Sequence, residues 1–111
     1  MVWAVYADFA IDFTAPLGFT EASIKAVRCD ADLVSCTAPI LISGRDRDVQ
    51  FGDVTIGADG RTYITWSEIQ GELEQTPQTF VHKLRVAPAG STRFGPTRVI
   101  ARETLFIPFG G

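Results

Sequence analysis

The 111-residue chain is long enough for one domain with a modest hydrophobic core. Its net charge of −3, with arginines spread along the chain, argues against a nucleic-acid-binding surface, which normally shows as a clustered basic face. No stretch approaches the roughly 20 apolar residues of a membrane span, so we expect no membrane segment.

The predicted elements are short β-strands. Runs rich in β-branched and aromatic residues alternate with turn signals, and helical periodicity is almost absent. In chain order the strands are predicted over 2–9, 22–29, 40–43, 49–56, 62–69, 80–86, 98–101 and 105–109. The clearest signal is Asp59-Gly60 between two such runs, which predicts a type I′ hairpin turn. We therefore expect an all-β fold.

The first residues bear on the location of the protein. Residues 1–6 read as a strand and lack the basic and long apolar regions of a signal peptide. This pattern predicts either a cytoplasmic protein or a piece of a longer one.

Cys29 and Cys36 flank a predicted turn, so they either pair across a hairpin or remain two buried free thiols. A disulfide would favour an extracellular or periplasmic location. Two cysteines and one distant histidine do not supply the four close ligands of a zinc site, and we predict no metal.

Sequence patterns recur in the same order at an offset of 57 to 60 residues. The matched segments are 3–8 with 63–68, 24–28 with 81–85, 38–42 with 95–100, and Arg45-Asp46 with Arg102-Glu103. A repeat of this length with four strands per unit is typical of a propeller blade.

This repeat predicts two four-stranded antiparallel, propeller-like blades within one domain. Residues 1–47 form a first repeat that lacks its inner strand, residues 48–104 form a second, and residues 105–111 supply a closing strand that completes the first blade. Two blades cannot close a propeller ring, so we expect a homo-oligomer joined through the terminal strands. The alternative fold is a β-sandwich or barrel.

The segments 49–56, 58–60 and 63–66 together resemble a blade of the sialidase-like propellers, the BNR or Asp-box repeat family. In that family an Asp-box forms the turn between the third and fourth strands. Residues 87–94 hold this place here and keep a glycine and the closing aromatic residue, but they lack the acid. Residues 29–37 hold it in the first repeat and depart further. The resemblance therefore implies a structural rather than a catalytic relation.

The strongest polar cluster is Arg45-Asp46-Arg47-Asp48. In the blade arrangement we expect this cluster on the same face as the loop that carries Phe13 and the loop that carries Glu72, and the resemblance implies that this face binds ligands. Arginine can bind a carboxylate with two hydrogen bonds and aspartate can accept from sugar hydroxyls, which predicts a glycan ligand. The alternative interpretation is a solvated turn whose charges pair locally.

Catalytic patterns are weak. Sialidases of this family use an arginine cluster and a Phe/Tyr-Arg-Ile-Pro motif; Phe106-Ile107-Pro108 resembles the end of that motif but has no arginine before it. His82 is interpreted as a packed side chain, because the sequence places no Ser or Cys nucleophile beside it. We therefore predict a non-enzymatic module that acts in assembly or surface recognition and needs no cofactor. The alternative is a sialidase-like glycoside hydrolase, or a fragment of one.

Overall fold

The structure, a computed structural model, describes residues 1–14, 19–70 and 78–105. This part of the chain contains strands and no helix, which confirms the all-β prediction. The strands are β1 (Val2–Ile11), β2 (Phe19–Cys29), β3 (Ile40–Leu41), β4 (Val49–Ile56), β5 (Thr62–Gln70), β6 (Gln78–Ala87) and β7 (Arg98–Leu105).

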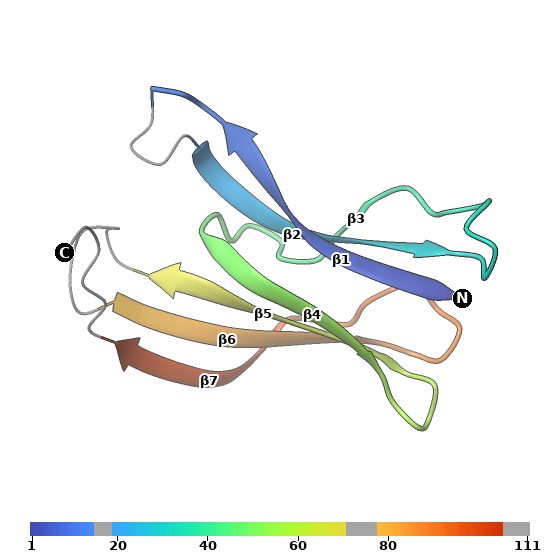
Figure 1. Ribbon diagram of the computed structural model, residues 1–111. Coiled ribbons are helices and arrows are strands. Elements are labelled where there is room, and N and C mark those ends of the chain that lie inside the picture. Colours follow the sequence, from blue (N-terminus) through green and yellow to red (C-terminus); the bar gives the residue numbers. More distant parts are fainter. Residues whose placement is uncertain (15–18, 71–77, 106–111) are drawn as a thin grey trace.

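The strands form two antiparallel sheets that follow chain order. The first sheet has the order β1-β2-β3 and the second the order β4-β5-β6-β7. Figure 1 shows the two sheets stacked as layers, with neither closed on itself. Among the described residues the first sheet has three strands and the second has four, and neither forms a closed barrel.

The last described strand, β7, is longer than predicted. We expected one strand to end at Ala101 and another to begin at Leu105, but β7 runs unbroken to Leu105, which pairs with Gln78 of the second sheet. The predicted break is absent because β6 extends to Gln78 and pairs with β7 on both sides of one register shift, at Ile100. Residues 106–109 of the predicted closing strand lie outside the described residues.

The turn of the central hairpin is not the predicted type I′ turn. That turn needs positive φ at both Asp59 and Gly60, but only Gly60 has it, at 83°. The Gly60 N–H donates to the Gly57 carbonyl at 2.9 Å and the Gly57 N–H to the Arg61 carbonyl at 2.8 Å. This is a three-residue loop in which the last position is left-handed. The Asp59 carboxylate accepts a hydrogen bond from the Arg61 N–H at 3.0 Å. Asp59 therefore stabilises the turn through its side chain, without adopting a positive φ.

The strand pairing of the two sheets can be matched, but not at the spacing of the sequence repeat. The β1–β2 pair Trp3–Arg28 matches the β5–β6 pair Tyr63–Val86, and the β2–β3 pair Lys25–Leu41 matches the β6–β7 pair Lys83–Val99. In both matches β2 and β6 are offset by 58 residues, whereas the matched segments 24–28 and 81–85 are offset by 57. Along β2 and β6 the hydrogen-bonded pairing therefore matches one residue away from the sequence repeat.

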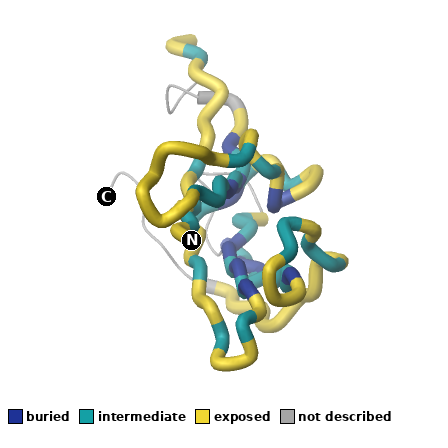
Figure 2. The backbone as a smooth tube through the Cα atoms, turned by 90° about the vertical axis from the view of Figure 1, so that its right-hand side faces the viewer, coloured by how far each residue is buried: buried dark blue, intermediate teal, exposed yellow. Residues whose placement is uncertain are grey.

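The core lies between the sheets and draws on both. Ile24 and Ile42 come from the first sheet and its following segment, and Val49, Ile64 and Trp66 from the second; all are at most 1% exposed. Figure 2 shows the buried parts of the chain near the centre of the molecule, with exposed segments around them. Each such side chain contributes about 1.5–3 kcal/mol by leaving water, so the two sheets depend on each other for stability.

The loops that follow β2 and β6 are closed by the same backbone bond. The Thr37 N–H donates to the Arg28 carbonyl, and the Gly95 N–H to the Val86 carbonyl, each at 2.8 Å. The first loop also contains the Cys29–Cys36 disulfide, which confirms one of the two alternatives for the cysteines.

The second loop is held by Arg85 instead of a disulfide. This guanidinium donates to the carbonyls of Phe94 and Gly95 at 3.0 and 2.8 Å. It also reaches the first sheet and its following segment, at the carbonyls of Ile42 and Leu41, at 3.0 and 3.3 Å. Arg85 therefore fastens one sheet to the other.

Candidate functional site

The predicted Arg45-to-Asp48 cluster is divided by the fold. Asp46 turns inward and accepts hydrogen bonds from Trp66 Nε1 at 3.2 Å and from Lys83 Nζ at 2.8 Å. Arg45 and Arg47 are exposed, and Arg47 lies 3.9 Å from Glu21. The two arginines remain available to a ligand, whereas Asp46 is committed to the junction between the sheets.

Lys83 lies at the centre of a half-buried charge network. Its ammonium contacts Asp46 at 2.8 Å and Glu68 at 3.1 Å. Burial acts to lower the pKa of Lys83, but the hydrogen bonds and charges of the two carboxylates outweigh it and the pKa is raised. Burial and the nearby charge of Glu68 raise the pKa of Asp48. The network holds the sheets together and leaves no free lysine for chemistry.

A hollow of about 380 Å³ lies beside the exposed arginines. Polar and charged side chains make up most of its lining: Glu21, Ser23, Lys25, Arg45, Asp46 and Arg47. Positive charges gather here, although Lys25 is held by Asp8 at 2.6 Å. The hollow suits an anionic group presented by a larger ligand.

The remaining predicted ligand residues outside the cluster are Phe13 and Glu72. Phe13 is 91% exposed in the turn after β1, as expected of a contact residue, but it does not line the hollow. Glu72 lies outside the described residues.

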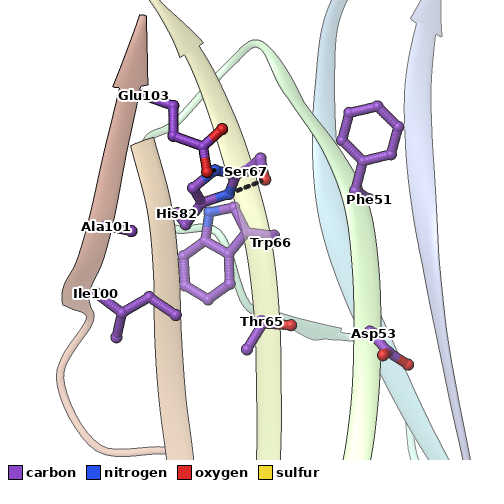
Figure 3. Close-up of a pocket in the computed structure, with 9 residues that line it drawn as sticks. All are labelled: Phe51, Asp53, Thr65, Trp66, Ser67, His82, Ile100, Ala101 and Glu103. Atoms are coloured by element: carbon purple, nitrogen blue, oxygen red, sulfur yellow. Dashed lines mark hydrogen bonds and ion pairs between the residues drawn. The ribbon is translucent and has the colours of Figure 1, made fainter. Parts of the chain in front are cut away.

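A larger pocket of about 540 Å³ lies on the outer face of the second sheet, away from the first sheet. Its lining comes from β4 to β7: Phe51, Asp53, Thr65, Trp66, Ser67, His82, Ile100, Ala101 and Glu103. Figure 3 shows Glu103, His82 and Ser67 close together at one end and the ring of Phe51 on the opposite side.

Ser67 and His82 are cross-strand neighbours, and Ser67 Oγ lies 2.7 Å from His82 Nδ1. The sequence places no serine beside His82, but strand pairing brings Ser67 there. Glu103 Oε1 lies 3.4 Å from His82 Nε2, close enough for an ion pair when the imidazole is protonated. Ser67, however, sits within a strand paired on both sides, where the sheet uses the backbone N–H groups that acyl transfer needs as oxyanion donors. The arrangement supplies a polar surface rather than a complete hydrolytic centre.

Phe51 is presented by an irregular stretch of β4. The register shifts between Gln50 and Asp53, and Phe51 has a φ of 61°, which a bulky residue rarely adopts. Its side chain is 71% exposed. Such strain persists only where the surrounding structure enforces it, and here it directs an aromatic ring toward solvent beside the pocket.

Comparisons with protein-family models, with curated proteins and with solved structures gave no match. Within residues 1–14, 19–70 and 78–105, no helix could cross a membrane and no group of side chains could hold a metal ion. The disulfide is compatible with an extracellular location.

Sequence reasoning missed the residues that depend on strand register. Ser67, His82 and Glu103 come from three different strands and form no motif along the chain. One antiparallel register of segment 62–69 against segment 80–86 pairs Ser67 with His82. The sequence does not select this register, because the connection between the two segments is too long to fix it.

Proposed function

We propose that the chain is a pair of blade-like β-repeats, resembling the sialidase-like propellers, that acts without catalysis through self-assembly and surface recognition. The observation that carries this proposal is that the strand pairing of the two sheets matches when β2 is aligned with β6 at an offset of 58 residues, together with the common bond that closes the loops after β2 and β6. Repeats of this kind bury their faces by stacking on neighbours, and two are too few to close a ring.

The uncovered surfaces support association. The outer face of the second sheet carries Phe51 and Ile100, which are 71% and 55% exposed. In the described part of the chain, β1 lies at the end of the strand order β1-β2-β3 and is the edge strand of the first sheet. An edge strand can pair with a further strand, and in our proposal the segment after Leu105 pairs with β1, in the same chain or in a neighbouring copy.

Light scattering across a range of concentrations tests this proposal. We expect a mass that is a multiple of the 12.1 kDa chain, because the uncovered faces and edges gain by association. A mass of one chain at every concentration would contradict self-assembly.

A second candidate function is the binding of an acidic carbohydrate in the hollow, favoured by the exposed Arg45 and Arg47. We expect the double variant Arg45→Ala, Arg47→Ala to lose binding of a sialic acid in NMR titration. Arg98→Ala, on β7 and away from the hollow, is the matched control. Cleavage of a fluorogenic sialoside that Arg45→Ala abolishes would instead favour a glycosidase.

A further inference from the structure

The outer face of the second sheet is the repeat counterpart of the face by which the first sheet contacts the second. Pairs of equivalent register identify the counterparts as Val5 and Thr65, Ala7 and Ser67, and Ile24 and His82. The first member of each pair packs into the core between the sheets, and Ile24 is fully buried. The second member of each pair lines the uncovered pocket.

The converse holds for the outer face of the first sheet. The pair Tyr6–Lys25 on this face corresponds to the pair Trp66–Lys83, which lies at the junction of the two sheets. The charges correspond as well: Lys25 contacts Asp8 at 2.6 Å, as Lys83 contacts Glu68 at 3.1 Å. Tyr6 is 39% exposed, whereas Trp66 is 1% exposed. The first sheet thus presents to solvent a copy of the surface that the second sheet has covered.

One acidic residue completes the junction within the chain. Asp46 comes from the segment after the first sheet and accepts from both Trp66 and Lys83. Its counterpart in the sequence repeat is Glu103, which lies at the outer pocket with its side chain 55% exposed. Glu103 is therefore exposed where it can contact a surface that carries a tyrosine and a lysine, such as the Tyr6–Lys25 face of another copy.

We propose that the outer face of the second sheet docks onto the outer face of the first sheet of another copy, head to tail. In this contact Glu103 accepts from Lys25 and from the Tyr6 hydroxyl of the second copy, as Asp46 accepts from Lys83 and Trp66 within the chain. The Tyr6 ring of the second copy enters the pocket beside His82. The inference rests on the proposed self-assembly and adds which surfaces meet.

The repeat also indicates that this contact is weaker than the junction within the chain. In the strand pairing Val27 stands where the second sheet has Arg85. The sequence repeat matches Arg28 with Arg85, but Arg28 donates to one carbonyl, that of Gly90 at 3.1 Å, whereas Arg85 donates to four. His82 and Ser67 stand in place of the buried Ile24 and the partly buried Ala7, which makes the contact more polar, as in reversible protein–protein interfaces. A head-to-tail contact is heterologous and builds rings or filaments according to its rotation.

Charge reversal tests the pairing. Glu103→Lys places a lysine opposite Lys25, and Lys25→Glu places a glutamate opposite Glu103. We expect each variant alone to run as a single chain of 12.1 kDa by light scattering, because like charges meet at every contact. An equimolar mixture should regain the wild-type mass, because every alternating contact then joins opposite charges. Asp32→Lys, in the exposed disulfide loop, makes the same charge change away from both faces and should assemble normally.

A more conservative variant separates the loss of the contact from a loss of folding. Glu103→Gln keeps the size of the side chain, and we expect it to weaken association about tenfold while circular dichroism stays unchanged. If the wild type assembles and these variants assemble equally well, the proposed surfaces are wrong although self-assembly stands. A single-chain mass for the wild type would overturn both.

Discussion

Arg85 offers a sharp test of what joins the two sheets. Its guanidinium donates to four carbonyls, two in the loop of its own sheet and two in the first sheet and the segment after it. A hydrogen bond from a charged donor contributes about 1.5–3 kcal/mol. Because Arg85 remains partly accessible, we count two of the four bonds at the lower value and expect Arg85→Ala to cost about 3 kcal/mol.

The assay is urea unfolding followed by tryptophan fluorescence, since Trp66 is buried at the junction that Arg85 supports. With a slope of about 1.5 kcal/mol per molar urea, the midpoint should fall by about 2 M. Arg85→Lys should lose about half as much, because one ammonium cannot reach all four carbonyls. Arg28→Ala is the matched control: Arg28 makes one exposed bond, to the Gly90 carbonyl, and its loss should cost under about 0.5 kcal/mol. If Arg85→Ala and Arg28→Ala unfold at the same urea concentration, Arg85 does not fasten the sheets.

Three further predictions concern stability. Replacing Cys29 and Cys36 with serine should lower the free energy of unfolding by about 2.4 kcal/mol, from the loop entropy of a separation of seven residues, and should match the effect of a reducing agent on the wild type in calorimetry. Asp48→Asn should stabilise the protein at pH 7 by less than about 1 kcal/mol. The raised pKa of Asp48 means that its favourable contribution is present below pH 3.8 and lost as the pH rises through the folded pKa, so urea midpoints of variant and wild type should converge in acid. Gly60→Ala should cost about 1 kcal/mol in thermal unfolding, because its φ of 83° strains any residue with a Cβ; Gly90→Ala, at 74°, should behave alike.

Much of the fold was predictable because each strand carries its own local signal. The β-branched runs and the Asp59-Gly60 turn located β4 and β5, and the sequence repeat then gave the strand order of both sheets. The turn type was wrong because two residues of sequence do not distinguish a two-residue loop from a three-residue loop. Hydrogen bonds at Gly57 and Arg61 decide between them.

The candidate site was predicted less well, because it depends on which side of a strand each residue faces. Asp46 and Arg45 are neighbours in the sequence, yet one is held inside the junction and the other is exposed. Conversely, Ser67 and Glu103 are far apart along the chain and meet at His82 only through strand pairing. A run of charged residues in a sequence does not show which side chains are exposed, because that depends on the fold.

The loops that follow β2 and β6 share one backbone closure and differ in what secures it. The first has a covalent bond between Cys29 and Cys36, whereas the second relies on the guanidinium of Arg85. A thiol reductant would therefore break a covalent bond in the loop after β2 and none in the loop after β6. Because the two sheets share one core, the loss of that bond lowers the stability of both, so a redox change at the first loop is transmitted to the whole described molecule.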